Sequence, residues 1–184
     1  EVLRGPQGTL FGRNTPAGIV KIDTVKPGDE LEAQYSVSYG SFNSLSMDGG
    51  ISIPIAPGVA SLRLSGLYQH RDDWIDNGFT GEEDFIGGFD EVAGRAQLSI
   101  TPDSRLSMLG TVAFRDLDAT STPFRANILG PGNNDLNANY DRDVVFYDAG
   151  GGNQANYNAL LASFRLDYEA DFATLTSITA YAET

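Results

Sequence analysis

The sequence contains no cysteine among its 184 residues. This absence excludes disulfide bonds, thiol catalysis and zinc sites with cysteine ligands. No run of about 18 apolar residues is present either, so the sequence predicts no transmembrane helix. Positive charge is scarce, because 12 Lys and Arg stand against 25 Asp and Glu, for a formal net charge of -13. Such an acidic chain is not expected to bind nucleic acid, or to be held on anionic lipid by basic residues.

Catalytic side chains are also scarce. His70 is the only histidine, and no serine can be placed beside it from the sequence, so a Ser-His-Asp triad is not indicated. The neighbouring carboxylates Glu82 and Glu83 lie in a polar stretch with no apolar pocket suited to acid–base chemistry. We therefore expect no enzyme, no catalytic residue and no cofactor.

The chain is rich in glycine, with 21 residues, and in alternating apolar and polar positions. Alternation with a period of two is typical of a β-strand that has one apolar and one polar face. The pattern predicts an all-β protein, but it leaves the two faces of the last segment open. The seven alternating segments are residues 32–39, 44–53, 61–69, 92–101, 105–115, 159–168 and 172–181.

The connections between these segments differ in length at the two ends. Residues 54–58, 102–104 and 169–171 are short turns, whereas residues 72–90 and 116–153 are long. Short turns at one end and long loops at the other are typical of an outer-membrane barrel, and compact soluble domains rarely contain so long an irregular loop. Seven strands cannot close such a barrel, because bacterial single-chain barrels have an even number of strands. We therefore expect part of a larger transmembrane antiparallel β-barrel, with its apolar face toward lipid and its polar face toward a wet lumen.

The first 27 residues, EVLRGPQGTLFGRNTPAGIVKIDTVKP, form a compact segment rich in glycine and proline. Glycine permits positive φ and close backbone approach, and proline stiffens the chain, which suits a small plug against a barrel wall. A glycine-rich surface turn is the alternative interpretation. A phosphate-binding loop is not indicated, because Gly12 is followed by Arg13 and Asn14 and not by Lys and Ser or Thr.

This segment resembles the end of the plug domain of TonB-dependent outer-membrane receptors. In that family an ExxRGPxGxLxGxN loop precedes a GG[AV]xNI[VI]T-like strand and a Lys-Pro exit into the first barrel strand. Ala17 and Lys21 depart from the pattern, while HRDDWIDN at residues 70–77 resembles the R-x-DGW-x-DN ending of an early barrel strand. The matching residues are Glu1, Arg4, Gly5, Pro6, Gly8, Leu10, Gly12 and Asn14 in the loop, and Gly18, Ile19, Ile22, Thr24, Lys26 and Pro27 in the strand and exit.

The resemblance implies two domains, the C-terminal end of a plug at residues 1–27 and the N-terminal part of the barrel at residues 28–184. It also implies a receptor of about 22 strands in the outer membrane of a Gram-negative bacterium. The implied partners are the TonB complex, reached through a segment upstream of Glu1, the lipid of the outer membrane, and a small ligand. A ferric siderophore is favoured among the ligand classes of the family, which also include cobalamin and glycans.

Five aromatic residues are candidates for contact with such a ligand: Trp74, Phe79, Phe85, Phe89 and Tyr140. For Trp74, a place at the membrane interface is favoured over ligand contact, because it lies next to a strand end. Residues 73–84 and 135–140 resemble calcium loops in part, but Ile75 and Tyr140 replace an oxygen ligand and the turn glycine. We expect solvated acidic loops and no metal site.

Two other functional classes remain open at this stage. A soluble β-sandwich that acts as a binding or adhesion module would show the same alternation, because its outer faces are solvated. A passive porin would share the barrel but not the plug segment.

Strand orientation can be tested at the neighbours Gln97 and Leu98, whose side chains must point to opposite faces. Leu98→Arg should reduce the free energy of unfolding by about 2–4 kcal/mol, the penalty for a cation near the bilayer midplane. Gln97→Arg should cost little. In the complete receptor in bilayers, a spin label at 98 should be relaxed by oxygen dissolved in lipid, and a label at 97 by a water-soluble reagent. Shielding of the label at 98 from both reagents would favour the sandwich.

Overall fold

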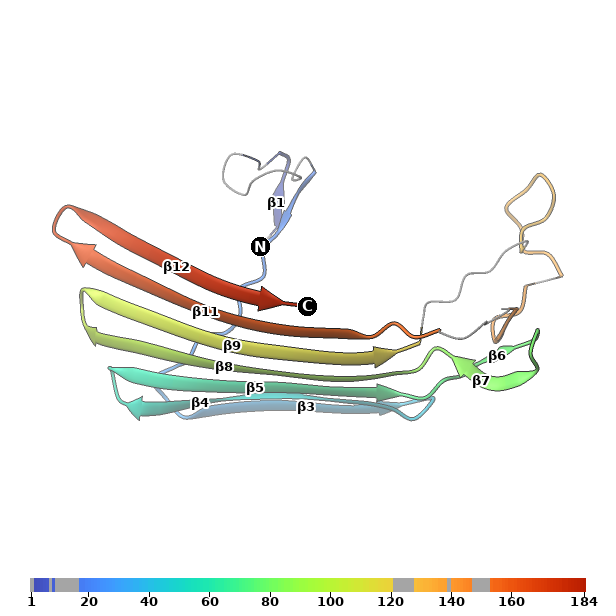
Figure 1. The fold of residues 1–184 in the computed structure, drawn as a ribbon, viewed down its shortest axis with the longest axis horizontal. Helices are drawn as coiled ribbons and strands as arrows, with labels where there is room; N and C mark the ends of the chain where they lie inside the picture. Colours follow the sequence, from blue (N-terminus) through green and yellow to red (C-terminus); the bar gives the residue numbers. More distant parts are fainter. Residues whose placement is uncertain (1, 7, 9–16, 121–127, 139, 147–152) are drawn as a thin grey trace.

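The computed structural model describes residues 2–6, 8, 17–120, 128–138, 140–146 and 153–184. Its main element is one open antiparallel sheet of seven strands in the order β12-β11-β9-β8-β5-β4-β3 (Figure 1). Successive strands along the chain are neighbours in this sheet, as in an up-and-down barrel wall. The strands are β3 (Glu32–Gly40), β4 (Ser44–Ala56), β5 (Ala60–Arg71), β8 (Phe89–Asp103), β9 (Leu106–Ala119), β11 (Tyr157–Ala170) and β12 (Ala173–Glu183).

Two smaller sheets lie outside this wall. Near the N-terminus, β1 (Val2–Arg4) pairs antiparallel with β2 (Gly18–Val20). Within the long connections, β6 (Ile75–Asn77), β7 (Glu82–Ile86) and β10 (Val144–Val145) form a three-stranded sheet. Among the residues that the structure describes, no helix has the length and apolar character needed to cross a membrane.

All seven segments predicted from alternation are strands, and the all-β fold with an open antiparallel sheet is confirmed. Several of these strands extend further than predicted. Residues 54–56 belong to β4, with a register irregularity between Pro54 and Ala56, so that the turn is shorter than the sequence indicated. The irregularity has a simple cause, because proline has no N–H to donate to the ladder.

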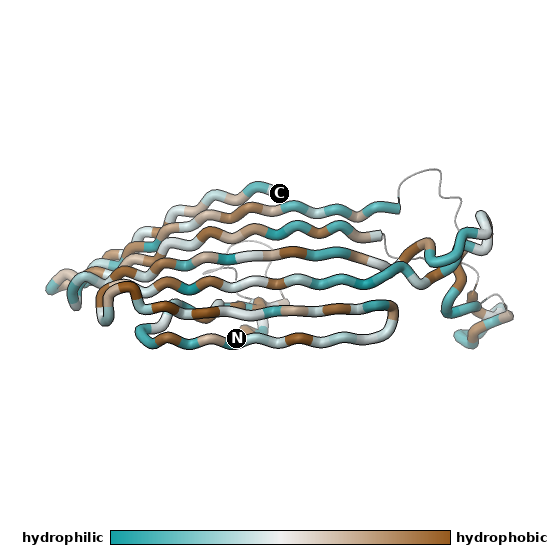
Figure 2. The backbone as a smooth tube through the Cα atoms, turned by 90° about the horizontal axis from the view of Figure 1, so that it is seen from below, coloured by the Kyte–Doolittle hydropathy of each residue, from teal (hydrophilic) through white to brown (hydrophobic). Residues whose placement is uncertain are grey.

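Register places the predicted apolar face of each strand on one side of the sheet, here called the outer face, although a few apolar residues such as Leu67, Leu109 and Leu161 lie on the other side. Residues that lie directly opposite each other in antiparallel strands point to the same side of the sheet. One such row runs Ala33, Ile51, Leu64, Ala96, Val112, Ala162 and Tyr181. Figure 2 shows the resulting alternation of hydrophobic and hydrophilic residues along the strands.

The register also assigns the faces of β12, which the sequence left open. Leu175 lies opposite Tyr168 and Tyr181 lies opposite Ala162, so the odd-numbered residues of β12 belong to the outer face. Ile178 lies opposite Arg165 on the other side, here called the inner face. The pattern was ambiguous because β12 carries an apolar residue on each of its faces.

The outer face contains an apolar band that ends in a polar residue on the loop side of each strand. Across the five steps from β4 to β12, this boundary shifts by two residues at three steps. Each residue adds about 3.3 Å along a strand, and neighbouring strands lie about 4.8 Å apart. The boundary therefore makes an angle of about 40° with a line drawn across the sheet at right angles to the strands. The last apolar residue and the polar residue beyond it are Leu45 and Asn43, Tyr68 and His70, Val92 and Asp90, Phe114 and Asp116, Leu160 and Asn158, and Tyr181 and Glu183.

At one position, the inner face is less accessible to solvent than the sequence predicted. Gln97 does point to the face opposite Leu98, but it is only 4% exposed, whereas Leu98 is 38% exposed. The chain ahead of β3 lies against the inner face here, and the Nε2 of Gln97 donates to the Oγ1 of Thr24 at 3.4 Å. The expectation of water contact at Gln97 was therefore wrong, because a contact between distant parts of the chain covers this side chain.

The structure supplies a better inner-face position for the orientation test. Ala113 lies on the inner face opposite Arg95 and Leu161, and its side chain is half-buried. In the complete receptor, a spin label at Ala113→Cys should be relaxed by a water-soluble reagent, and one at Val112→Cys by oxygen in lipid. Equal access of the water-soluble reagent to both positions would contradict the assignment of the two faces.

Candidate functional site

The two long connections are joined into one body at the end of the wall. Strand β10 of the second connection pairs in parallel with β6 of the first, with Val144 opposite Asp76 and Val145 opposite Asn77. The amide of Asp76 donates to the carbonyl of Asp143 at 2.8 Å, and the amide of Gly78 donates to that of Val145 at 2.8 Å. Because these bonds connect segments far apart in the sequence, the described parts of the two connections share one sheet, here called the loop sheet.

The loop sheet has a small apolar core of its own. Ile75, Ile86 and Val145 are buried, with Ile86 fully enclosed, and Trp74 and Phe85 pack against them. From the sequence, residues 73–84 and 135–140 were expected to be solvated acidic loops. Glu82, Glu83 and Asp84 are exposed as expected, whereas Ile75 is buried, because each short strand contributes an apolar residue that the others cover.

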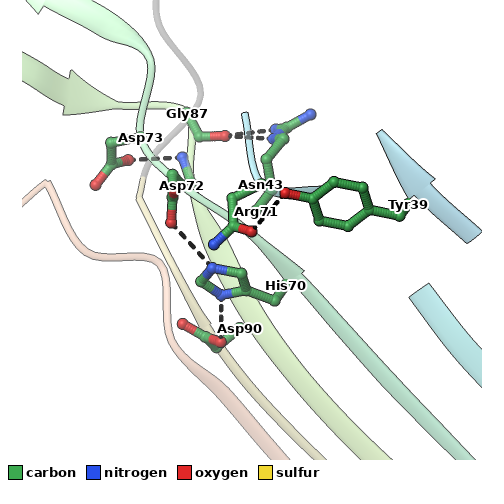
Figure 3. A network of polar contacts seen from close by, with 9 residues as sticks. Tyr39, Asn43, His70, Arg71, Asp72, Asp73, Gly87 and Asp90 are labelled. Carbon is green, nitrogen blue, oxygen red and sulfur yellow. Dashed lines mark hydrogen bonds and ion pairs between the residues drawn. The ribbon is translucent and has the colours of Figure 1, made fainter. Parts of the chain in front are cut away.

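A polar network holds the base of the loop sheet to the wall (Figure 3). The carboxylate of Asp73 accepts hydrogen bonds from the amide of Gly88 at 2.6 Å and from the hydroxyl of Thr120 at 3.1 Å. The Nε of Arg71 donates to the carbonyl of Gly87 at 2.9 Å. A Cβ at Gly88 would lie 2.7 Å from the amide of Asp73, so this close approach requires glycine. The network joins the start of one long connection to the start of the other.

His70 lies just beyond the apolar band on the outer face. Its Nδ1 is 2.8 Å from the carboxylate of Asp90, and its Nε2 is 2.9 Å from that of Asp72 (Figure 3). This histidine therefore lies between the last apolar row and the loops.

The structure separates the five aromatic candidates into three groups. Trp74 stacks on Phe42 with ring centroids 4.9 Å apart, and it also packs on the loop-sheet core together with Phe85. These two have a structural role that the sequence did not indicate. Phe89 is half-buried on the wall, where the guanidinium of Arg71 lies 5.0 Å from its ring.

Phe79 and Tyr140 are both exposed to solvent. Phe79 is 63% exposed, and Tyr140 is exposed in the second connection. Sequence reasoning missed Phe146, which is 69% exposed and lies so close to Gly78 that a Cβ there would be 2.6 Å from its ring. The signal that could have identified it is the apolar triplet Val144, Val145 and Phe146 within a polar stretch.

The residues of the plug motif lie partly within the described structure. Arg4 ends β1 opposite Gly18, and Pro6 and Gly8 follow it in the chain. Gly5 and Gly18 have φ of 82° and 132°, as expected for positions that favour glycine, and a Cβ at Gly18 would collide with the carbonyl oxygen of Leu3. Gly12 and Asn14 lie outside the described residues.

Charged side chains near the plug end are solvent-exposed. The ammonium of Lys21 lies 2.8 Å from the carboxylate of Asp23 and holds the pKa of that carboxyl below its usual value. Both groups are exposed, so this ion pair contributes little to stability. Among the described residues, no three His, Cys, Asp or Glu side chains are grouped so that they could hold a metal ion.

Comparison with known proteins gives two relatives of interest. The chain is 32% identical over 116 residues to the pesticin receptor of Yersinia pestis, covering 63% of this chain and 17% of that protein. It is 30% identical over 73 residues to the ferrioxamine B receptor of Salmonella typhimurium, covering 39% of this chain and 10% of that protein. No protein-family model matches the sequence.

A solved structure has the same fold. The crystal structure of the ferric yersiniabactin uptake receptor FyuA from Yersinia pestis superposes with a TM-score of 0.71 and 24% sequence identity. The match covers 98% of this chain and 27% of that one. The chain therefore spans about a sixth of the pesticin receptor sequence and about a quarter of the solved receptor.

The loop-sheet core can be tested by truncating Ile86. Ile86→Ala should destabilise the loop sheet by about 2–5 kcal/mol, because it leaves a cavity in a core of few residues. Hydrogen exchange at the amides of Asp76 and Gly78 should accelerate, while exchange in β8 and β9 stays unchanged. Leu136→Ala is the matched control, because Leu136 is an exposed apolar residue of the second connection. Unchanged exchange at both amides would contradict a shared loop sheet.

Proposed function

We propose that this chain, a homologue of TonB-dependent outer-membrane receptors, forms the plug end and the first barrel strands of a receptor that takes up a ferric siderophore. TonB-dependent receptors are Gram-negative outer-membrane proteins, and they are transporters and not enzymes. We assign residues 1–27 to the plug and residues 28–184 to the barrel.

The observation that carries this proposal is the apolar band on the outer face. On β8, for example, the band extends from Val92 to Ile100. This length agrees with the 9–11 residues that a tilted β-strand needs to cross a membrane. The inclination of about 40° at the loop-side boundary equals the strand tilt of outer-membrane barrels, about 35–45°. A flat water boundary across tilted strands produces such an inclined edge. A sheet that is surrounded by water is not expected to have an inclined edge of this kind.

The alternative functions are less well supported. A β-sandwich needs two facing sheets, whereas the seven long strands that the structure describes form a single sheet with edges at β3 and β12. In the proposed receptor, further strands continue from these two edges and close the barrel. A passive porin would explain the wall but not the plug motif at residues 4–18 or the similarity to receptors for specific ligands.

The geometry suggests how this part of the receptor would act. The loop sheet is tied to the wall at its base, so it would present a preformed surface outside the membrane. Phe79 and Phe146 would supply exposed aromatic faces, which suit an organic iron chelate with apolar parts. The TonB complex would then act on the plug from the other side and open a path along the inner face.

A ferric siderophore is favoured as the ligand because two of the similar proteins are receptors named for one. The names refer to ferrioxamine B in one case and to ferric yersiniabactin in the other. These names state the ligands of the similar proteins and not the ligand of this chain. For this chain the exposed aromatic residues are the feature that supports the same ligand class.

The proposal can be tested by uptake of iron-55 bound to ferrioxamine B or to yersiniabactin. Cells of a Gram-negative host without its own siderophore receptors should accumulate the label when they express the complete receptor. Deletion of tonB should abolish uptake. Phe79→Ala with Phe146→Ala should weaken binding about tenfold or more, since stacking of two aromatic faces is lost.

A matched control is Phe172→Ala, because Phe172 is highly exposed but lies in the short turn at the opposite end of the wall. Binding of the iron complexes should be unchanged in this variant. Iron accumulation that continues after deletion of tonB would favour the passive porin. Absence of uptake for both complexes, with normal receptor level, would reject a siderophore of these two types.

A further inference from the structure

The chain that leads into β3 contacts the inner face of the wall at two points. Thr24 accepts the hydrogen bond from Gln97 of β8 at 3.4 Å, and Asp29 accepts one from the hydroxyl of Ser61 of β5 at 2.9 Å. β5 and β8 are neighbouring strands, so the two contacts lie side by side on the sheet. Figure 1 shows this part of the chain passing across the wall on its way to β3.

The wall beneath this segment is the most enclosed part of the inner face. Ser52, Ser61, Arg63 and Gln97 are all buried, although they are polar and lie on the face that lines the lumen. The Nη1 of Arg63 donates to the hydroxyl of Ser52 at 2.8 Å. In the described residues, no buried side-chain nitrogen or oxygen lacks a hydrogen-bond partner. Polar groups that are buried and also satisfied indicate a fitted contact.

The next residues in the same row mark where the contact ends. Thr111 and Ser163 follow Gln97 across β9 and β11 at the same register. Both are half-buried, and within the described structure neither forms a hydrogen bond with residues 21–31. The buried part of this row therefore covers β4, β5 and β8, and the hydrogen bonds to the segment ahead of β3 come from Ser61 and Gln97 alone among these strands.

We infer that Ser61 and Gln97 are positioning residues that dock residues 24–29 on the inner face, so that residues 24–27, the end of the segment assigned to the plug, stay with the wall. The inference rests on the proposed function, in which the wall surrounds a plug that TonB displaces. Displacement of the plug would then end at Thr24. The docked segment would keep the polar row of the wall covered while the rest of the lumen opens.

The experiment places a spin label at Lys26, which is exposed and lies between the two contacts. The described chain has no native cysteine to interfere with Lys26→Cys. In the complete receptor, purified in bilayers, the label should show mainly slow motion in its electron paramagnetic resonance spectrum. Ser61→Ala with Gln97→Ala should raise the mobile fraction severalfold. Ser61→Thr, which keeps the hydroxyl, should retain the slow spectrum.

Thr111→Ala with Ser163→Ala is the matched control, because it removes two hydroxyls from the same row without touching either contact. This pair should leave the label slow. Heat-dependent migration of the barrel on a gel shows that each variant is folded, and Ser61→Ala alone replaces the double variant if the latter does not fold.

Two results would overturn the inference. The label could already be mobile in the parent receptor, or it could stay equally slow when Ser61 and Gln97 lose their side chains. The measurement uses neither TonB nor an iron complex. Failure of iron uptake would therefore reject the proposed function without affecting this result, and a mobile label would reject docking without affecting uptake.

Discussion

Strand register is the constraint on which the rest of this structure depends. Side chains alternate between the two faces, so a slip of one residue at any pairing would exchange the faces of all strands beyond it. At the pairing of β5 with β8, for example, Leu64 lies opposite Ala96 and Arg63 lies opposite Gln97. A slip by one would bring Arg63 into line with an apolar position. The continuous apolar band and the polar inner wall both exist only because every neighbouring pair keeps its register.

The long connections depend on that wall for their arrangement. β5 and β8 are neighbours in the wall, β9 and β11 are neighbours as well, and β8 pairs with β9, so the two long connections leave the wall at neighbouring points. Asp73 and Thr120 then meet at the base, and β6 and β10 can pair in parallel although they are far apart in sequence. The small core of Ile75, Ile86 and Val145 completes the loop sheet. A rigid wall therefore converts two polar loops into one ordered surface.

The inner face combines two requirements that usually conflict. A lumen needs polar side chains, but polar side chains that are covered need partners. Arg63 and Ser52 satisfy each other, and the segment ahead of β3 satisfies Ser61 and Gln97. The same side chains can therefore line a wet path in one region and bind protein in another. The inner face thus provides an attachment for the chain that leads into the wall.

Period-two alternation in the sequence was sufficient to determine the seven long strands and their faces up to β11, because local side-chain periodicity reports directly on a half-buried strand. The unequal lengths of the connections determined the end of the wall at which the loops lie. The motif of residues 4–18 was recognised by its resemblance to a receptor family, and the positive φ of Gly5 and Gly18 agrees with the expectation that these positions favour glycine. Only the tertiary structure decided the faces of β12, the existence of β10 and the burial of Gln97. Each of these depends on a partner distant in sequence: β11 for β12, β6 for Val144 and Val145, and Thr24 for Gln97. Local periodicity carries no information about such partners.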